Sequence, residues 1–110
     1  MSWLIREGDV LAAVEPRRPG WTRELAGAVV LPGPALVHTL GSPTGLDVAW
    51  CRRVRTDGGE PCLEVRKVAC LAGRRLALPR LGAGAIIAAA PGAFERWHLQ
   101  VGDRLEVRES

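Results

Sequence analysis

The sequence predicts a mainly β protein, an antiparallel β-sandwich or partly open barrel of seven to eight short strands with two short helices. Three observations predict this fold. Short apolar segments alternate with polar residues, which is typical of half-buried strands. Turn residues separate these segments at spacings of about ten residues, and the 110 residues include 13 glycines and 8 prolines. Because a chain of this length has room for one core, we expect a single domain spanning residues 1–110.

The first half of the chain is expected to begin with a hairpin whose tight turn contains Gly8, because glycine readily adopts a positive φ. Trp21 and Leu25 are spaced to lie on one side of a short helix that ends at Gly27. The elements predicted here are strands at 3–6, 10–14, 29–31 and 35–40, and a helix at 21–26.

The clearest alternation begins at Leu46 and continues to Val54, and a turn at 57–59 returns the chain into a second strand. The apolar parity of that second strand switches near Arg66 and Lys67, which predicts a β-bulge. The elements predicted in this half are strands at 46–54, 62–71 and 86–89, a last strand within 101–107 after a Gly-Asp turn, and a helix at 90–97, with Gly73 turning the chain into 74–78.

Composition excludes several classes of protein. Hydrophobic residues make up 47% and charged residues 25%, which excludes wholesale disorder. No apolar run is long enough to span a bilayer, so we expect no membrane partner. The N-terminus lacks an apolar export segment, and the three cysteines form no Cys-x-x-Cys pair. Both observations favour a reduced cytoplasmic location.

Charge is unevenly distributed along the chain. The formal net charge is +3, but residues 52–80 hold eight basic and three acidic side chains, a net +5. This segment suggests a positive face that attracts an anionic partner. We do not expect nucleic acid, because no exposed aromatic pattern or reading element accompanies the charge. Weak electrostatic binding of anionic polymers through Arg52–Arg80 is kept as an alternative function.

Reactive residues do not form a recognised catalytic or metal motif. Ser42, His38 and Asp47 lie close enough in sequence to be written as a triad, but no Gly-x-Ser-x-Gly elbow surrounds Ser42. The cysteines and histidines lack the spacing of a zinc site, so we predict no metal and no cofactor. Cys51 and Cys62 flank a turn, and the sequence leaves open whether they pair.

Two segments together resemble the DUF192 family of small bacterial and archaeal domains. They are Val37–Cys51, which contains His38, Gly41 and Asp47, and Ala90–Leu105, which contains a closing Gly-Asp turn. Ser42 stands where the family has methionine, and Ala88 stands where it has glutamate. The resemblance implies an antiparallel sandwich-like domain of uncharacterised function.

We therefore predict a non-catalytic binding or interaction module that acts through the segment ending at Asp47 and takes a small ligand or a protein partner. The predicted binding residues are His38, Gly41, Ser42, Asp47 and Trp50. The alternative is a small hydrolase-like or carbohydrate-processing enzyme that uses Asp47 and His38. Direct cooperation of these two groups in acid–base catalysis requires that they lie within hydrogen-bond reach or are bridged by one water.

Overall fold

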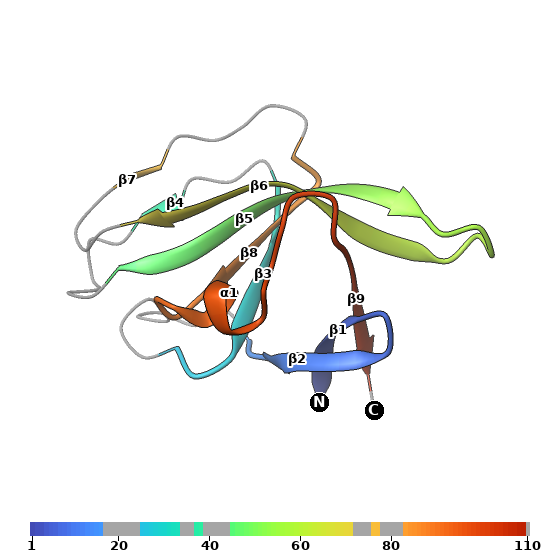
Figure 1. Cartoon of the computed structure of the whole chain (residues 1–110), viewed down its shortest axis with the longest axis horizontal. Helices are drawn as coiled ribbons and strands as arrows, with labels where there is room; N and C mark the ends of the chain where they lie inside the picture. Colours follow the sequence, from blue (N-terminus) through green and yellow to red (C-terminus); the bar gives the residue numbers. More distant parts are fainter. Residues whose placement is uncertain (17–24, 34–36, 39–44, 72–75, 78–82, 110) are drawn as a thin grey trace.

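The computed structural model describes residues 1–16, 25–33, 37–38, 45–71, 76–77 and 83–109. Seven strands of this part close into a barrel, and two short strands form a separate sheet (Figure 1). The barrel order is β1 (Ser2–Arg6), β2 (Asp9–Val14), β3 (Ala28–Pro32), β8 (Ala85–Ala89), β5 (Leu46–Arg55), β6 (Pro61–Leu71) and β9 (Arg104–Glu109). The small sheet pairs β4 (Val37–His38) with β7 (Leu76–Ala77), and the helix is α1 (Ala93–Arg96).

The mainly β prediction is confirmed. The main sheet is a closed seven-stranded barrel, which is consistent with the predicted sandwich or barrel architecture, and it closes because β9 pairs with both β1 and β6. Closure gives every barrel strand a hydrogen-bonded neighbour on both sides over part of its length. The ladder is antiparallel except between β2 and β3, which run parallel and pair through Val14 and Ala28. The described residues form the seven barrel strands, the two-residue strands β4 and β7, and a single helix in place of the two helices predicted.

The first predicted helix falls mostly on residues 17–24, outside the described part. Its last residues are described and are not helical, because they enter the β2–β3 seam. The Gly27 N–H donates to the Glu15 carboxylate, and the Glu15 N–H donates to the Ala28 carbonyl at 2.7 Å. These hydrogen bonds hold the residues that follow the predicted helix against the end of β2.

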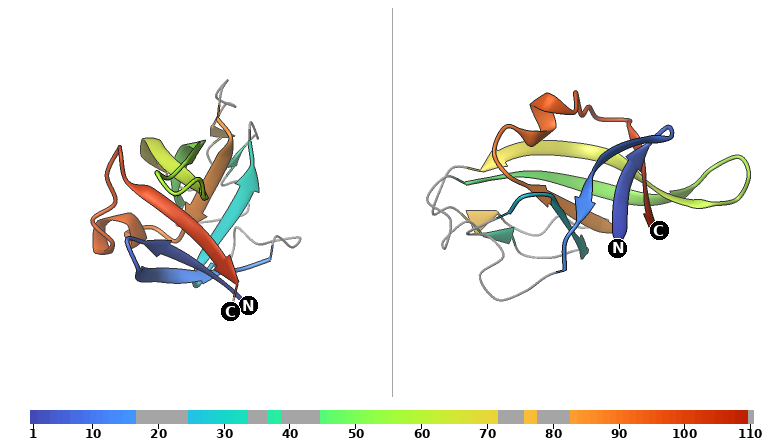
Figure 2. Two further views of the ribbon diagram at one scale, coloured as in Figure 1. Left: turned by 90° about the vertical axis from the view of Figure 1, so that its right-hand side faces the viewer. Right: turned by 90° about the horizontal axis from the view of Figure 1, so that it is seen from below.

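The two hairpins form as the sequence predicted. Glu7 and Gly8 both have positive φ, 50° and 86°, the pattern of the tight primed turn that matches strand twist. In the longer β5–β6 hairpin, Trp50 lies opposite Lys67 while Cys51 lies opposite Val65. The intervening residue of β6 is therefore extra, and the predicted bulge is confirmed. This hairpin extends well beyond the barrel (Figures 1 and 2).

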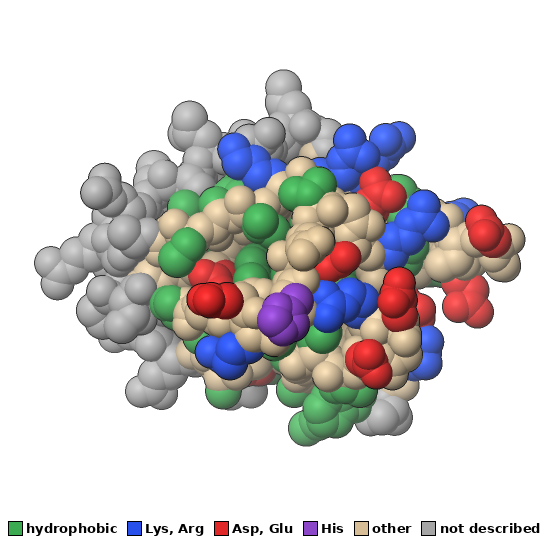
Figure 3. All heavy atoms as spheres, viewed as in Figure 1, with side chains coloured by type: hydrophobic (Ala, Val, Ile, Leu, Met, Phe, Trp, Pro, Cys, Tyr) green, Lys and Arg blue, Asp and Glu red, His purple; other side chains and the backbone are tan. Residues whose placement is uncertain are grey.

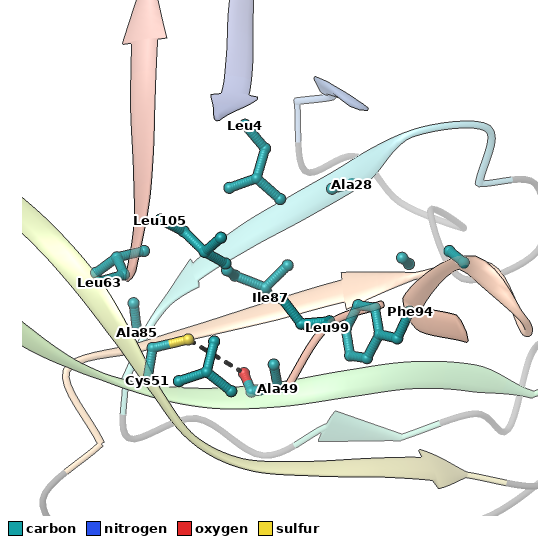
Figure 4. Packing of buried hydrophobic residues seen from close by; sticks show 13 residues of the cluster. Leu4, Ala28, Ala49, Cys51, Leu63, Ala85, Ile87, Phe94, Leu99 and Leu105 are labelled. Atoms are coloured by element: carbon teal, nitrogen blue, oxygen red, sulfur yellow. Dashed lines mark hydrogen bonds between the residues drawn. The ribbon is translucent and has the colours of Figure 1, made fainter. Parts of the chain in front are cut away.

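Apolar side chains fill the barrel and also cover part of its outer surface. The interior cluster includes Leu4, Cys51, Ile87 and Leu105 (Figure 4). A second cluster on the outer side of β3, β8 and β5 includes Trp50. All five residues of β8 are buried, which explains why this strand is an unbroken apolar run instead of an alternating one.

The register answers the question that the sequence left open about Cys51 and Cys62. Cys51 lies opposite Val65, whereas Cys62 lies opposite Val54, so the two cysteines do not face each other across the hairpin. Both are buried free thiols.

Helix α1 covers one end of the barrel and is held there by an arginine from β1. Arg6 donates to the carbonyl oxygens of Trp97 at 2.6 Å and His98 at 3.3 Å, just after the helix. It also forms an ion pair with Asp103 at 3.0 Å, and the Asp103 carboxylate accepts the Gln100 N–H at 2.9 Å. Arg6 therefore ties the segment between α1 and β9 to the first strand.

Candidate functional site

Asp47 is the buried charged residue of the described part of the chain, with 5% of its surface exposed. It is the second residue of β5 and shares its strand face with Ala49 and Cys51, which belong to the barrel interior. Its Oδ2 accepts a hydrogen bond of 3.1 Å from the backbone N–H of Phe94 in α1. Burying a carboxylate requires such compensation. The contact therefore couples the start of β5 to the helix at the barrel end.

Cys70 of β6 lies directly opposite Asp47 in the antiparallel register. A hydrogen bond with the Asp47 carboxylate raises the pKa of the Cys70 thiol, and burial and the negative charge of Asp47 act in the same direction. The thiol is exposed, yet a raised pKa keeps it protonated and weakly nucleophilic near neutral pH. It can serve as a hydrogen-bond donor beside the carboxylate, but the site does not activate it for covalent catalysis.

A cavity of about 330 Å³ lies where this end of the β5–β6 hairpin meets α1. Its ionisable lining groups are two carboxylates and one thiol, and the rest of the lining is apolar or backbone. Gly92 permits the sharp bend before α1, with φ at 87°. Figure 3 shows acidic and apolar side chains at the helix on this face, with a basic side chain and a histidine beside them. The cavity is lined by Asp47, Val68, Ala69, Cys70, Gly92, Phe94 and Glu95.

The structure places the five predicted binding residues differently. Asp47 lines the cavity, whereas Trp50 points to the opposite face of β5 and is buried in the outer cluster. Gly41 and Ser42 lie outside the described residues. The backbone of His38 pairs with that of Leu76, and the position of its side chain is likewise outside the description. Figures 1 and 2 place β4 on the side of β5 away from α1.

Sequence reasoning missed Cys70 and Glu95 as lining residues. A signal for Cys70 was present, because pairing the two predicted strands with the bulge included sets position 70 opposite Asp47. Nothing local signalled Glu95, since its place in the lining depends on how α1 packs on the barrel end.

The basic segment is only partly described. Glu64 accepts ion pairs from Arg66 at 3.0 Å and Arg104 at 3.5 Å. The hydrogen bond from Arg66 is the main cause that lowers the pKa of Glu64. Part of the positive charge of this face is therefore neutralised within the protein. Three further basic residues of the predicted segment, Arg74, Arg75 and Arg80, lie outside the described residues.

Comparison with protein-family models, with curated proteins and with solved structures found no match. Within the described part of the chain, no three His, Cys, Asp or Glu side chains are grouped to hold a metal ion. No helix in that part is long and apolar enough to cross a membrane.

The cysteines give a direct test of this site. In the native protein, we expect an alkylating reagent to label Cys70 first, because Cys51 and Cys62 are buried and burial raises the pKa of Cys51 to about 12. The substitution Asp47→Asn removes the interaction that raises the Cys70 pKa, so the thiolate fraction at pH 8 and the labelling rate should both increase. Mass spectrometry of the labelled peptides, measured as rate against pH, checks both results. If the labelling rate of Cys70 depended on pH in the same way in Asp47→Asn and in the wild type, the Asp47 carboxylate would not influence the Cys70 thiol.

Proposed function

We propose that the protein is a non-catalytic binding module whose ligand occupies the cavity beneath α1. The observation that carries this proposal is the buried Asp47 carboxylate in the cavity lining, held by the Phe94 N–H. A concave, mostly apolar site with a few converging polar groups is the usual form of a small-molecule site. Its volume of about 330 Å³ suits a small ligand.

The charges of the lining favour a cationic ligand. Asp47 and Glu95 both contribute carboxylates, and the lining includes no Lys, Arg or His. A small organic amine with an apolar body would place its ammonium group at Asp47 and its body against Val68 and Phe94. The ammonium donates three hydrogen bonds and neutralises a carboxylate that is otherwise costly to bury.

The chemistry of Cys70 supports binding over catalysis. A nucleophilic cysteine needs a lowered pKa and a positively charged neighbour, whereas the neighbour here is a carboxylate that raises the pKa. The alternative of a hydrolase-like enzyme using Asp47 and His38 remains a proposal without geometric support, because the His38 side chain is outside the described residues. Membership of the DUF192 family is likewise a proposal. Asp47, which belongs to the first of the two resembling segments, lines this cavity.

Titration with small amines tests the proposed function. We expect benzylamine and cyclohexylamine to bind the purified protein and to shift the NMR amide signals of Phe94, Cys70 and Val68. The uncharged analogue benzyl alcohol should bind at least about tenfold more weakly, since it loses the charge-assisted hydrogen bond. Asp47→Asn should weaken amine binding by a similar factor.

Matched variants exclude indirect effects. Glu60→Gln removes a carboxylate from the exposed β5–β6 turn and should leave amine affinity unchanged. Val68→Phe fills the cavity without altering charge and should abolish binding. Thermal unfolding of each variant shows whether it is folded. Equal binding of amine and alcohol, or binding that Val68→Phe does not affect, would contradict the proposal.

A further inference from the structure

A second concavity lies toward the other end of the β5–β6 hairpin and differs in character from the first. Asp47 and the arginine of this second site, Arg53, are six residues apart on β5, roughly 20 Å along a strand. The concavity has a volume of about 300 Å³ and is lined by Val30, Arg53, Pro61, Cys62, Leu63, Leu105 and Val107. We call it the Arg53 groove.

The walls of the Arg53 groove are strongly apolar. Leu105 is fully buried and Leu63 is 6% exposed, and both belong to the interior cluster of the barrel. Val107 is 45% exposed and is one of the few large apolar side chains of the described surface that solvent reaches to this extent. An exposed valine beside buried leucines presents apolar surface that a ligand could remove from water.

Arg53 supplies the charge of this groove, and its side chain is held in place. Its Nε donates to the carbonyl oxygen of Gly84 at 3.1 Å. Gly84 is itself fixed, because its N–H donates to the Cys51 carbonyl at 2.8 Å and its carbonyl also accepts the Gly33 N–H at 3.2 Å. A Cβ at position 84 would lie 2.8 Å from Arg53 Cγ and 3.0 Å from Arg53 N. Glycine at this position therefore allows the arginine stem to pack directly on the β8 entry.

The hydrogen bond to Gly84 engages Nε and not the two terminal nitrogens of the guanidinium. A guanidinium has five N–H donors, and its terminal pair matches the two oxygens of a carboxylate. The groove lining contains no carboxylate, in contrast to the cavity beneath α1. The two concavities therefore favour ligands of opposite charge.

We propose that the Arg53 groove binds a small monocarboxylate with an apolar tail. The carboxylate pairs with the Arg53 guanidinium, and the tail lies along Val30, Leu105 and Val107. A volume near the lower end of small-molecule sites favours a medium-length alkyl or a single-ring aromatic acid over a long-chain lipid. This site is separate from the proposed amine site and does not depend on it.

Titration with straight-chain alkanoates from butyrate to octanoate, followed by NMR and calorimetry, tests the proposal. Affinity should increase by about fourfold per added methylene until the groove is filled. Octylamine and octanol, used below their aggregation concentrations, should bind at least about tenfold more weakly than octanoate. Addition of octanoate should shift the NMR amide signals of Leu63, Leu105 and Val107.

Variants locate the binding. Arg53→Gln should weaken octanoate binding at least about tenfold, because a charge-assisted pair is lost. Arg55→Gln is the matched control, since Arg55 is an exposed arginine of the same hairpin and bonds the Gly59 carbonyl at 2.8 Å; it should leave affinity unchanged. Val107→Asp places a negative charge at an exposed wall position, so it should fold and should repel octanoate.

Asp47→Asn separates this site from the amine site, because it should leave octanoate binding intact. Three results would overturn the proposal. These are equal octanoate affinity in Arg53→Gln and wild type, equal binding of octylamine and octanoate, and octanoate-induced shifts confined to α1. The last result would indicate that the acid uses the other cavity.

Discussion

Replacing Ile87 with alanine is expected to destabilise the protein by about 3 to 4 kcal/mol. Ile87 is fully buried in the barrel interior, opposite Val30 of β3 and Ala49 of β5. The neighbouring interior positions of these strands carry small side chains, among them Ala28, Ala85 and Ala89. Such side chains cannot move into the space that the isoleucine leaves, so most of the cavity should persist. The measurement is the free energy of unfolding from denaturant titration.

Two further substitutions calibrate this result. Ile87→Val removes one methylene and should cost about 0.5 to 1.5 kcal/mol. Val10→Ala, at a position 57% exposed on β2, should change stability by less than about 0.5 kcal/mol. A loss below about 1 kcal/mol in Ile87→Ala would mean that β8 does not form the central wall of the interior described above.

The β5–β6 hairpin was predictable because its determinants are local. Alternation along 46–54, a Gly-rich turn and the parity switch at Arg66 all lie within one stretch of about 25 residues, and all agree with the structure. The strand β8 was predictable as a buried apolar run for the same reason. The fact that β8 is covered on both faces could not be derived, since the outer cluster draws on Leu25, Leu71 and Ala83 from three other parts of the chain.

Closure of the barrel was not predictable from local pattern. It depends on β9 pairing with β1, which begins at Ser2, and on the single parallel contact between Val14 and Ala28. A half-buried strand in a sandwich and one in a barrel carry the same alternation, so periodicity cannot distinguish the two. Residues 25–26, the described end of the expected helix, are not helical, and Gly27 after them bonds with Glu15 beside the contact between β2 and β3.

The candidate site was predicted only through Asp47. The sequence singled out this residue as the retained acid of a resembling segment, but its partners come from elsewhere in the fold. Phe94 lies 47 positions along the chain, and its N–H reaches Asp47 only because α1 covers the barrel end. Trp50 was predicted at the same site and is close to Asp47 in sequence. The two side chains lie on opposite faces of β5, Asp47 on the inner face and Trp50 on the outer one.

The position of α1 depends on Arg6, and the second large expected effect concerns this residue. Arg6→Gln should destabilise the protein by about 2 to 3 kcal/mol. The guanidinium joins β1 to the carbonyls of Trp97 and His98 and to the Asp103 carboxylate, and the two partners of the ion pair are only 24% and 26% exposed. Removing it leaves these acceptors without the charged donor, which costs more than the loss of an exposed ion pair.

The variant should also loosen the site. Because Arg6 holds the segment after α1, we expect faster hydrogen exchange at the Phe94 and Leu99 amides in Arg6→Gln. Amine affinity should decrease as exchange at these amides becomes faster. Arg108→Gln is the matched control, since Arg108 forms an exposed pair with Glu106 at 2.7 Å; it should leave stability and exchange at Phe94 unchanged. If Arg6→Gln lowered stability while exchange at Phe94 stayed at the wild-type rate, the arginine would support the barrel without positioning α1 over Asp47.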